Sequence, residues 1–202
     1  AIGSGIAVHE PAGNMIVDIG GGTTEVAVIS LGGIVVSQSL RVAGDELTES
    51  IGAYVKREFS LDLGENTCEE IKIQMGSAWK LEEEFTADIG GRDSISGLPR
   101  RIELTTEHIR EALAEPLTAI IDAIKSTLDK TPPELAADIM ENGIMLSGGG
   151  ALLTGIAQRV SHETGMRAIV AADPLYSVVF GSGQALENID AMRGLLTQTG
   201  ID

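Results

Sequence analysis

Three runs rich in apolar residues predict three strands within the first 45 residues. Residues 15–19 and 26–29 are β-branched runs that flank Gly20-Gly21-Gly22-Thr23-Thr24, so they predict a strand, a tight turn and a returning strand. The glycine-rich segment at residues 31–33 then leads into a third apolar stretch, residues 34–42. We therefore expect a three-stranded meander.

Helical spacing of apolar residues replaces this strand pattern after residue 44. Leu47, Ile51 and Val55 recur at helical intervals after an acidic first turn, and they predict one helix. Thr67 with Glu70 three residues later matches a capping box and predicts the start of a second. Residues 82–89 and 98–104 predict a hairpin joined by a polar turn at 90–97.

The second half of the sequence alternates between helical and strand patterns. Thr105 is a predicted N-cap for a helix over 106–114, and Pro116 predicts a kink or the start of a new helix that extends to residue 129. The remaining expected elements are a helix at 134–141, a strand at 143–147, a glycine turn at 148–150, a helix at 151–164, a strand at 168–170 and a helix at 177–189. In the helix at 151–164, Leu152 and Leu153 should face inward. The fold class is therefore α/β.

Composition narrows the function classes. Aromatic residues make up only 3% of the chain and hydrophobic residues 43%, which favours an aliphatic α/β core. The formal net charge of −16 argues against a nucleic-acid-binding surface and against direct adsorption to anionic lipid. No apolar run is long enough to span a membrane. The single cysteine, Cys68, favours a reducing, cytoplasmic compartment, and we expect it to be packed and unreactive beside Glu69 and Glu70.

The first glycine turn has the residue types of an anion site. Successive residues without a Cβ let the backbone adopt positive φ and bring several N–H groups to phosphate oxygens, while Asp18 could hold Mg²⁺ through water. The motif is not a Walker loop, because Gly-Lys-Thr is absent and a strand follows. A glycine-rich hairpin turn without a ligand is the alternative that this motif leaves open.

Two further segments are candidate ligand contacts. Gly148-Gly149-Gly150, between a strand and an expected helix, could present a helix N-terminus to a nucleotide or could serve only close packing of the helix on the strand. Glu69 and Lys72 could contact ribose and phosphate, or could form an ordinary ion pair at helical spacing. Met75 and Met166 could line an adenine slot or belong to the core.

In combination, these segments resemble the superfamily of actin, heat-shock protein 70 and the sugar kinases, and within it the MreB family of bacterial actins. The resemblance covers essentially all 202 residues. The motifs that carry it are Asp18-Ile19-Gly20-Gly21-Gly22-Thr23-Thr24-Glu25-Val26-Ala27-Val28-Ile29-Ser30-Leu31-Gly32-Gly33, Glu69-Glu70-Ile71-Lys72, Glu111-Ala112-Leu113-Ala114-Glu115-Pro116-Leu117, Thr131-Pro132-Pro133-Glu134-Leu135-Ala136 and Gly148-Gly149-Gly150-Ala151-Leu152-Leu153.

The resemblance implies an actin-like (ribonuclease H-like) ATPase domain, in which helices flank a mixed sheet. A larger subdomain would comprise residues 1–45 and 116–202, with a smaller α+β subdomain, residues 46–115, inserted. It implies ATP or ADP and Mg²⁺ as cofactors, with Asp18 holding Mg²⁺ through water and Thr23 orienting the attacking water. The implied nucleotide contacts are Gly20, Gly21, Gly22, Thr23, Glu69, Glu70, Ile71, Lys72, Gly148, Gly149, Gly150 and Ala151.

The resemblance also indicates that the chain is the second domain of a longer protein. The first phosphate loop, the main catalytic acidic residue and the membrane-binding element of the family have no counterpart in this sequence, so we expect the chain alone to hydrolyse ATP poorly or not at all. The implied partners are further copies in a head-to-tail filament, a membrane adaptor and the cell-wall elongation machinery. The alternatives are half of a chaperone or sugar kinase, and a self-association module that needs no nucleotide.

Overall fold

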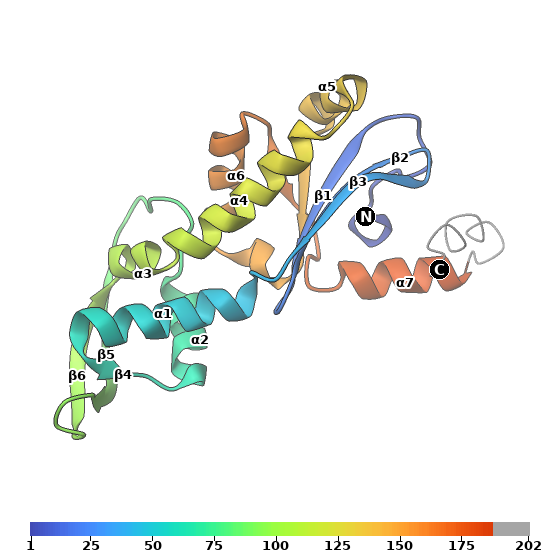
Figure 1. The fold of residues 1–202 in the computed structure, drawn as a ribbon. Helices are drawn as coiled ribbons and strands as arrows, with labels where there is room; N and C mark the ends of the chain where they lie inside the picture. Colours follow the sequence, from blue (N-terminus) through green and yellow to red (C-terminus); the bar gives the residue numbers. More distant parts are fainter. Residues whose placement is uncertain (188–202) are drawn as a thin grey trace.

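A five-stranded mixed sheet forms one half of the molecule (Figure 1). The computed structural model describes residues 1–187. The strand order is β3-β2-β1-β7-β8; β1 pairs antiparallel with β2 and parallel with β7. These strands are β1 (Asn14–Ile19), β2 (Thr24–Ser30), β3 (Gly33–Leu40), β7 (Ile144–Ser147) and β8 (Ala168–Val170). The expected meander is confirmed, and the central strand β1 is buried on both faces because apolar residues occupy four of its six positions.

A smaller antiparallel sheet forms the other half, with the order β4-β5-β6. Its strands are β4 (Leu61–Asp62), β5 (Thr86–Asp93) and β6 (Pro99–Thr105). The predicted turn at 90–97 was wrong, because β5 continues through Gly90 and Gly91 to Asp93. Gly91 lies so close to β4 that a Cβ there would be 2.7 Å from the Asp62 carbonyl oxygen. Glycine in this strand therefore permits close strand approach instead of marking the turn.

Helices pack on both sheets. Helices α1, α2 and α3 pack together beside the small sheet, α4 crosses β2 and β3 of the large one, and α7 packs with the 3-10 turn η1 on the opposite side (Figure 1). The helical elements are η1 (Ile2–Ser4), α1 (Gly44–Phe59), α2 (Glu65–Met75), α3 (Thr106–Ala112), α4 (Ala114–Asp129), α5 (Pro133–Asn142), η2 (Gly149–Leu152), α6 (Ile156–Thr164) and α7 (Ser177–Glu187). None of the described helices is long and apolar enough to cross a membrane.

Two of the predicted helix starts had opposite outcomes. Thr105 is the N-cap of α3, and its hydroxyl accepts from the His108 N–H at 3.1 Å while His108 Nδ1 accepts from the Thr105 N–H. Thr67 is not a cap, because α2 already begins at Glu65 after Gly64, which provides no side-chain cap.

Pro116 lies in the first turn of α4, so it marks the start of a new helix and not a kink. The last two residues of the expected helix 177–189 lie outside the described part of the chain.

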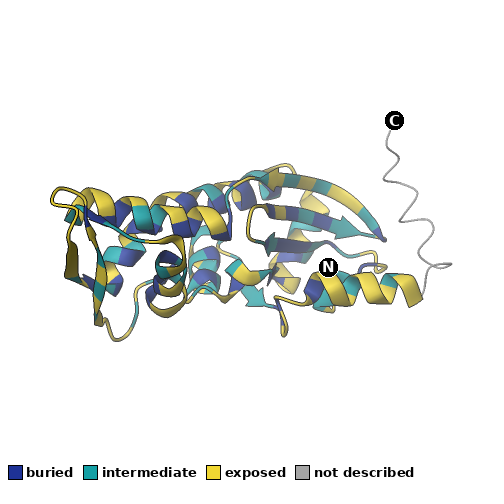
Figure 2. Cartoon of the chain, turned by 90° about the horizontal axis from the view of Figure 1, so that it is seen from below, coloured by how far each residue is buried: buried dark blue, intermediate teal, exposed yellow. Residues whose placement is uncertain are grey.

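One aliphatic core runs through both halves. Figure 2 shows buried residues between the sheets and the helices, whereas α7 is mostly exposed. Ile19, Ile71 and Ile124 belong to the same buried cluster, although they come from different halves. The expected subdomain boundaries at 45/46 and 115/116 fall in the first turns of α1 and α4. The division into two subdomains therefore remains a prediction. Cys68 is buried, as expected, and burial together with the Glu65 charge raises the pKa of its thiol.

Candidate nucleotide-binding site

A cavity of about 430 Å³ lies where the two halves meet. Side chains and backbone from the first glycine turn, the N-terminal turn of α1, one face of α2 and the segment after β7 form its walls. The lining residues are Gly20, Gly21, Gly44, Asp45, Leu47, Glu69, Lys72, Ile73, Gly76, Gly149, Gly150, Leu152, Leu153, Thr154 and Leu175. Three segments far apart in the sequence, each singled out from its residue types, are therefore brought to a single cavity.

The first glycine turn is attached to the N-terminus of α1. The Gly44 N–H donates to the Gly20 carbonyl at 3.0 Å, and the Asp45 N–H donates to the Gly21 carbonyl at 2.8 Å. The carbonyls are thus occupied by α1. Within residues 1–187, the N–H groups of Gly21, Gly22 and Thr23 have no hydrogen-bond acceptor. These three donors are available for an anion.

The glycines of this turn are not there for the reason that the sequence suggested. Positive φ was expected at Gly20, Gly21 and Gly22, and this was wrong, because none of them has positive φ. A Cβ on Gly21 would lie 3.4 Å from Asp45 Oδ1, and one on Gly22 would lie 3.9 Å from Asp45 Oδ2, which are ordinary contact distances. The folded chain would therefore accept a Cβ atom at both positions.

The second glycine turn has the opposite character. Gly148 has a φ of +82°, and a Cβ there would be 2.3 Å from the Ile19 carbonyl oxygen; a Cβ on Gly150 would be 2.2 Å from Ile19 Cγ2. These two glycines are required for close packing on β1. Of the turn, Gly149 and Gly150 line the cavity, while Ala151 is buried in the core.

The helix expected at 151–164 begins only at Ile156. A 3-10 turn covers Gly149–Leu152, and Thr154 forms an isolated parallel bridge with Ser77, with the Ala78 N–H donating to the Thr154 carbonyl at 2.7 Å. The prediction that a helix N-terminus faces the site at Gly148–150 is therefore wrong. Leu152, expected to point inward, is 56% exposed at the cavity. Pairing with a distant segment overrides the helical pattern here.

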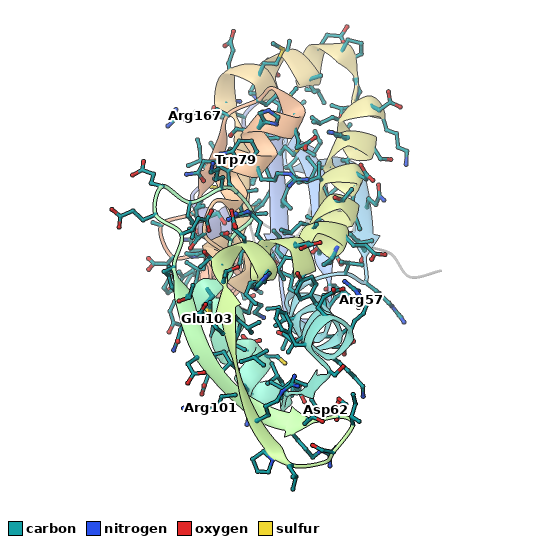
Figure 3. All side chains as sticks on the ribbon, turned by 90° about the vertical axis from the view of Figure 1, so that its left-hand side faces the viewer. Arg57, Asp62, Trp79, Arg101, Glu103 and Arg167 are labelled. Carbon is teal, nitrogen blue, oxygen red and sulfur yellow. The ribbon has the colours of Figure 1, made fainter. Side chains whose placement is uncertain are left out.

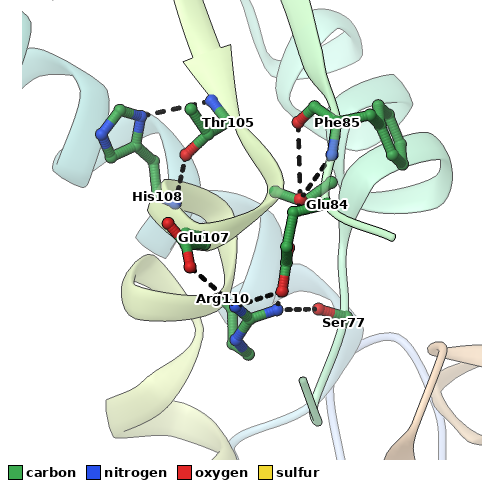
Figure 4. A network of polar contacts seen from close by, with 8 residues as sticks. Ser77, Glu84, Phe85, Thr105, Glu107, His108 and Arg110 are labelled. Carbon is green, nitrogen blue, oxygen red and sulfur yellow. Dashed lines mark hydrogen bonds and ion pairs between the residues drawn. The ribbon is translucent and has the colours of Figure 1, made fainter. Parts of the chain in front are cut away.

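Arg110 of α3 binds the segment that follows α2, which contains Ser77 (Figure 4). Its guanidinium donates to Ser77 Oγ at 3.2 Å and forms a two-pronged ion pair with Glu84, at 2.8 and 3.3 Å. Thr106 donates to the same Glu84 carboxylate. Figure 3 shows Trp79 beside α6, where its ring lies 4.8 Å from that of His162. The segment that follows α2 is thus held between α3 and α6.

Lys72 and Glu69 form the polar part of the α2 wall. The Lys72 ammonium donates to the Gly44 carbonyl at 2.8 Å and to Thr48 Oγ1 at 2.9 Å, and lies 2.7 Å from Glu69 Oε2. Partial burial acts to raise the pKa of the Glu69 carboxyl, but hydrogen bonds from Lys72 and Thr48 and the ammonium charge lower it overall. Glu69 is therefore a carboxylate at neutral pH.

The other predicted site residues lie around the cavity without lining it. Glu70 is exposed on α2, and Ile71 is buried in the core. Asp18 is the penultimate residue of β1 and lies beside the second glycine turn, where its Oδ1 would be 2.6 Å from a Cβ on Gly148. Thr23 is exposed in the first turn. Met75 and Met166 pack in or against the core, so neither forms the adenine slot considered from the sequence.

Several cavity residues were not predicted as site residues. Asp45 and Leu47 lie in α1, whose sequence indicated only a helix start, and Thr154 belongs to the segment that was expected to be helical. Ile73 and Leu175 are 72% and 61% exposed at the cavity. One indication of these residues was present in the sequence: Ile73 is an apolar residue on the polar face of a predicted helix, and an exposed apolar residue can mark a binding surface.

Comparisons with known proteins agree with this architecture. A family model described as MreB/Mbl protein matches residues 1–194. The cell shape-determining protein MreB of Escherichia coli (strain K12) is 49% identical over 194 residues, covering 96% of this chain and 56% of that protein. The cell shape-determining protein Mbl of Bacillus subtilis (strain 168) is 45% identical over 192 residues, covering 95% and 58%. The chain thus spans little more than half the length of these relatives.

Solved structures show the same fold. MreB5 of Spiroplasma citri bound to ADP superimposes with a TM-score of 0.91 at 40% identity, covering 94% of this chain and 57% of that one. A MamK double helical filament gives a TM-score of 0.73 at 25% identity, covering 86% and 54%. The expected actin-like fold, with helices flanking a mixed sheet, is confirmed. Because the family model spans nearly the whole chain and the relatives agree with it, the chain belongs to the MreB/Mbl family.

Proposed function

We propose that the cavity binds ATP and ADP, and that the chain is the second domain of a bacterial actin-like protein whose filaments direct cell shape and cell-wall synthesis. The observation that carries the nucleotide proposal is the contrast between the two glycine turns. Gly148 and Gly150 are required by packing on Ile19, whereas the fold leaves room for a Cβ atom at Gly21 and at Gly22. A phosphate group that approaches the three available N–H groups of this turn would explain why Cβ atoms are absent there.

The α2 wall complements this phosphate turn. Glu69 Oε2 is occupied by Lys72 and Thr48, while Oε1 has no hydrogen-bond partner within the described residues. A free carboxylate oxygen at a cavity wall accepts hydrogen bonds from hydroxyl groups, as ribose would present them. Exposed Ile73, Leu152 and Leu175 offer apolar contact at the same cavity. Both walls therefore fit a nucleotide whose phosphates lie at the β1–β2 turn and whose nucleoside lies near α2.

The residues around the turn also fit a magnesium nucleotide. Asp18 and Thr23 provide a carboxylate and a hydroxyl beside it, and oxygen ligands are those that Mg²⁺ prefers. The nucleotide would supply the phosphoanhydride bond, while Asp18 would hold the metal through water and Thr23 would orient the attacking water. We assign slow ATP hydrolysis to the intact protein, and little or none to this chain alone.

Self-association is proposed from the relatives. MreB5 was solved with ADP and with AMPPNP, and MamK was solved as a double helical filament. We propose that the intact protein likewise forms head-to-tail filaments in the cytoplasm. A membrane adaptor and the cell-wall elongation machinery would be its partners. The net charge of −16 on this chain opposes direct adsorption of this part of the protein to anionic lipid. A chaperone or sugar kinase is disfavoured by the family match.

Calorimetric titration of this chain with Mg-ADP and Mg-ATP tests the nucleotide proposal. We expect saturable binding that Lys72→Ala and Gly21→Val both abolish. Lys125→Ala is the matched control, because it also removes a lysine paired with a glutamate, at 2.7 Å from Glu163, but outside the cavity. Equal binding by wild type, Lys72→Ala and Gly21→Val would contradict the site. Assembly of the full-length protein that needs no nucleotide would instead favour a self-association module.

A further inference from the structure

Thr48 lies behind the α2 wall of the cavity, in the second turn of α1. It is 5% exposed and does not line the cavity. Its Oγ1 accepts from the Lys72 ammonium at 2.9 Å and lies 2.5 Å from Glu69 Oε2 and 3.1 Å from the Gly44 carbonyl. One hydroxyl therefore contacts both members of the Glu69–Lys72 pair.

The proton count shows what this hydroxyl does. An ammonium group has three protons, and Lys72 directs them to the Gly44 carbonyl, Thr48 Oγ1 and Glu69 Oε2. A hydroxyl has one proton, and the shortest contact directs it from Thr48 to Glu69. The Lys72 side chain is 14% exposed, so water replaces a lost acceptor poorly, whereas the Glu69 side chain is 45% exposed. Gly44 and Thr48 are thus the fixed partners of Lys72.

We propose that Thr48 is a positioning residue of the nucleotide site, whose hydroxyl holds the Lys72 ammonium and the Glu69 carboxylate in the orientation that receives the ligand. This inference rests on the proposed nucleotide function of the cavity. The hydroxyl acts in both directions: it accepts a hydrogen bond from the Lys72 ammonium and donates one to the Glu69 carboxylate, so neither partner can be reoriented without breaking a hydrogen bond to α1. The first two turns of α1 are hydrogen-bonded to the first glycine turn, and through Thr48 and the Gly44 carbonyl they also hold the α2 wall of the cavity.

Thr48→Val and Thr48→Ser in the full-length protein separate this role from packing. Valine keeps the branched shape and removes the hydroxyl; serine keeps the hydroxyl. We expect Thr48→Val to weaken Mg-ADP binding about tenfold, equivalent to about 1.4 kcal/mol, and Thr48→Ser to retain affinity within about twofold. The matched control is Thr127→Val, because Thr127 is likewise a buried threonine within a helix, but its hydroxyl donates to the Ala123 carbonyl at 2.8 Å, outside the cavity.

The pKa of the Glu69 carboxyl, followed by carbon-detected NMR, gives a second readout without nucleotide. Loss of the Thr48 donor should raise this pKa in Thr48→Val, and Thr127→Val should leave it unchanged. Affinity and pKa equal to wild type in Thr48→Val would overturn the proposal, as would equal losses of affinity in the valine and serine variants. Failure of the wild-type protein to bind Mg-ADP would refute the nucleotide function instead, and the pKa comparison would still decide whether Thr48 positions Glu69.

Discussion

Replacing Gly21 by alanine should stabilise the free protein while weakening nucleotide binding. The new Cβ would lie 3.4 Å from Asp45 Oδ1, an ordinary van der Waals distance, and the backbone of Gly21 does not have positive φ. Alanine therefore restricts the unfolded chain without straining the folded one, and the free energy of unfolding should rise by about 0.4–1 kcal/mol. The same methyl group would occupy space next to the turn's N–H groups, so Mg-ADP should bind at least about tenfold more weakly, a loss of about 1.4 kcal/mol.

Gly150→Ala is the contrasting variant from the second turn. Its Cβ would lie 2.2 Å from Cγ2 of Ile19, which is 1% exposed and has no room to move. Overpacking of this kind costs about 1–3 kcal/mol, so stability should fall. Urea denaturation of the free proteins measures both stabilities, and titration with Mg-ADP measures affinity. Two results would contradict these expectations: a loss of stability in Gly21→Ala as large as that in Gly150→Ala, or Mg-ADP binding by Gly21→Ala equal to that of the wild type.

Three further predictions concern charge and pH. Burial and the hydrogen bond to Glu111 raise the pKa of Tyr54 to about 12, so ultraviolet titration should detect one phenol that ionises at unusually high pH. The contribution of neutral Tyr54 to the stability of the fold should be lost as pH rises from about 10 through that value, and Tyr54→Phe should remove both effects. Hydrogen bonds from the Ser96 N–H and hydroxyl lower the pKa of Asp93, so its contribution to stability is present above about pH 4 and is lost as pH falls through the lowered pKa. Unfolding curves of Asp93→Asn and wild type should therefore converge in acid; curves that stay equally far apart would contradict this. Arg110→Lys keeps the charge but loses the two-pronged geometry, so its urea midpoint should fall, and an unchanged midpoint would show that charge alone holds the wall.

Local sequence patterns correctly predicted those elements whose structure depends on neighbouring residues. The apolar, β-branched runs on either side of Gly20–22 correctly predicted β1, the turn and β2, because such runs and the glycines between them act over a few residues. Thr105 was recognised as an N-cap for the same reason. The three segments of the cavity were identified by residue type, and the structure shows that Gly21, Lys72 and Gly150 line one space.

Features that depend on distant partners could not be read from the sequence. The helical pattern after Gly150 gives way to a bridge between Thr154 and Ser77, which lie 77 positions apart in the numbering. Thr67 has the spacing of a capping box, yet α2 starts two residues earlier. Thr48 carries no motif, because its role depends on Lys72 of another helix. The positions of Asp45 and Ile19 in space were also needed to show why glycine occurs in each of the two turns.

The most direct test of the central claim is a structure of the full-length protein with Mg-AMPPNP. We expect phosphate oxygens within hydrogen-bonding distance of the N–H groups of Gly21, Gly22 and Thr23. We also expect a ribose hydroxyl to donate to Glu69 Oε1, and Lys72 to keep its hydrogen bond to Thr48. A nucleotide bound elsewhere, or phosphates directed to Gly148–150 with the first turn empty, would contradict the central claim.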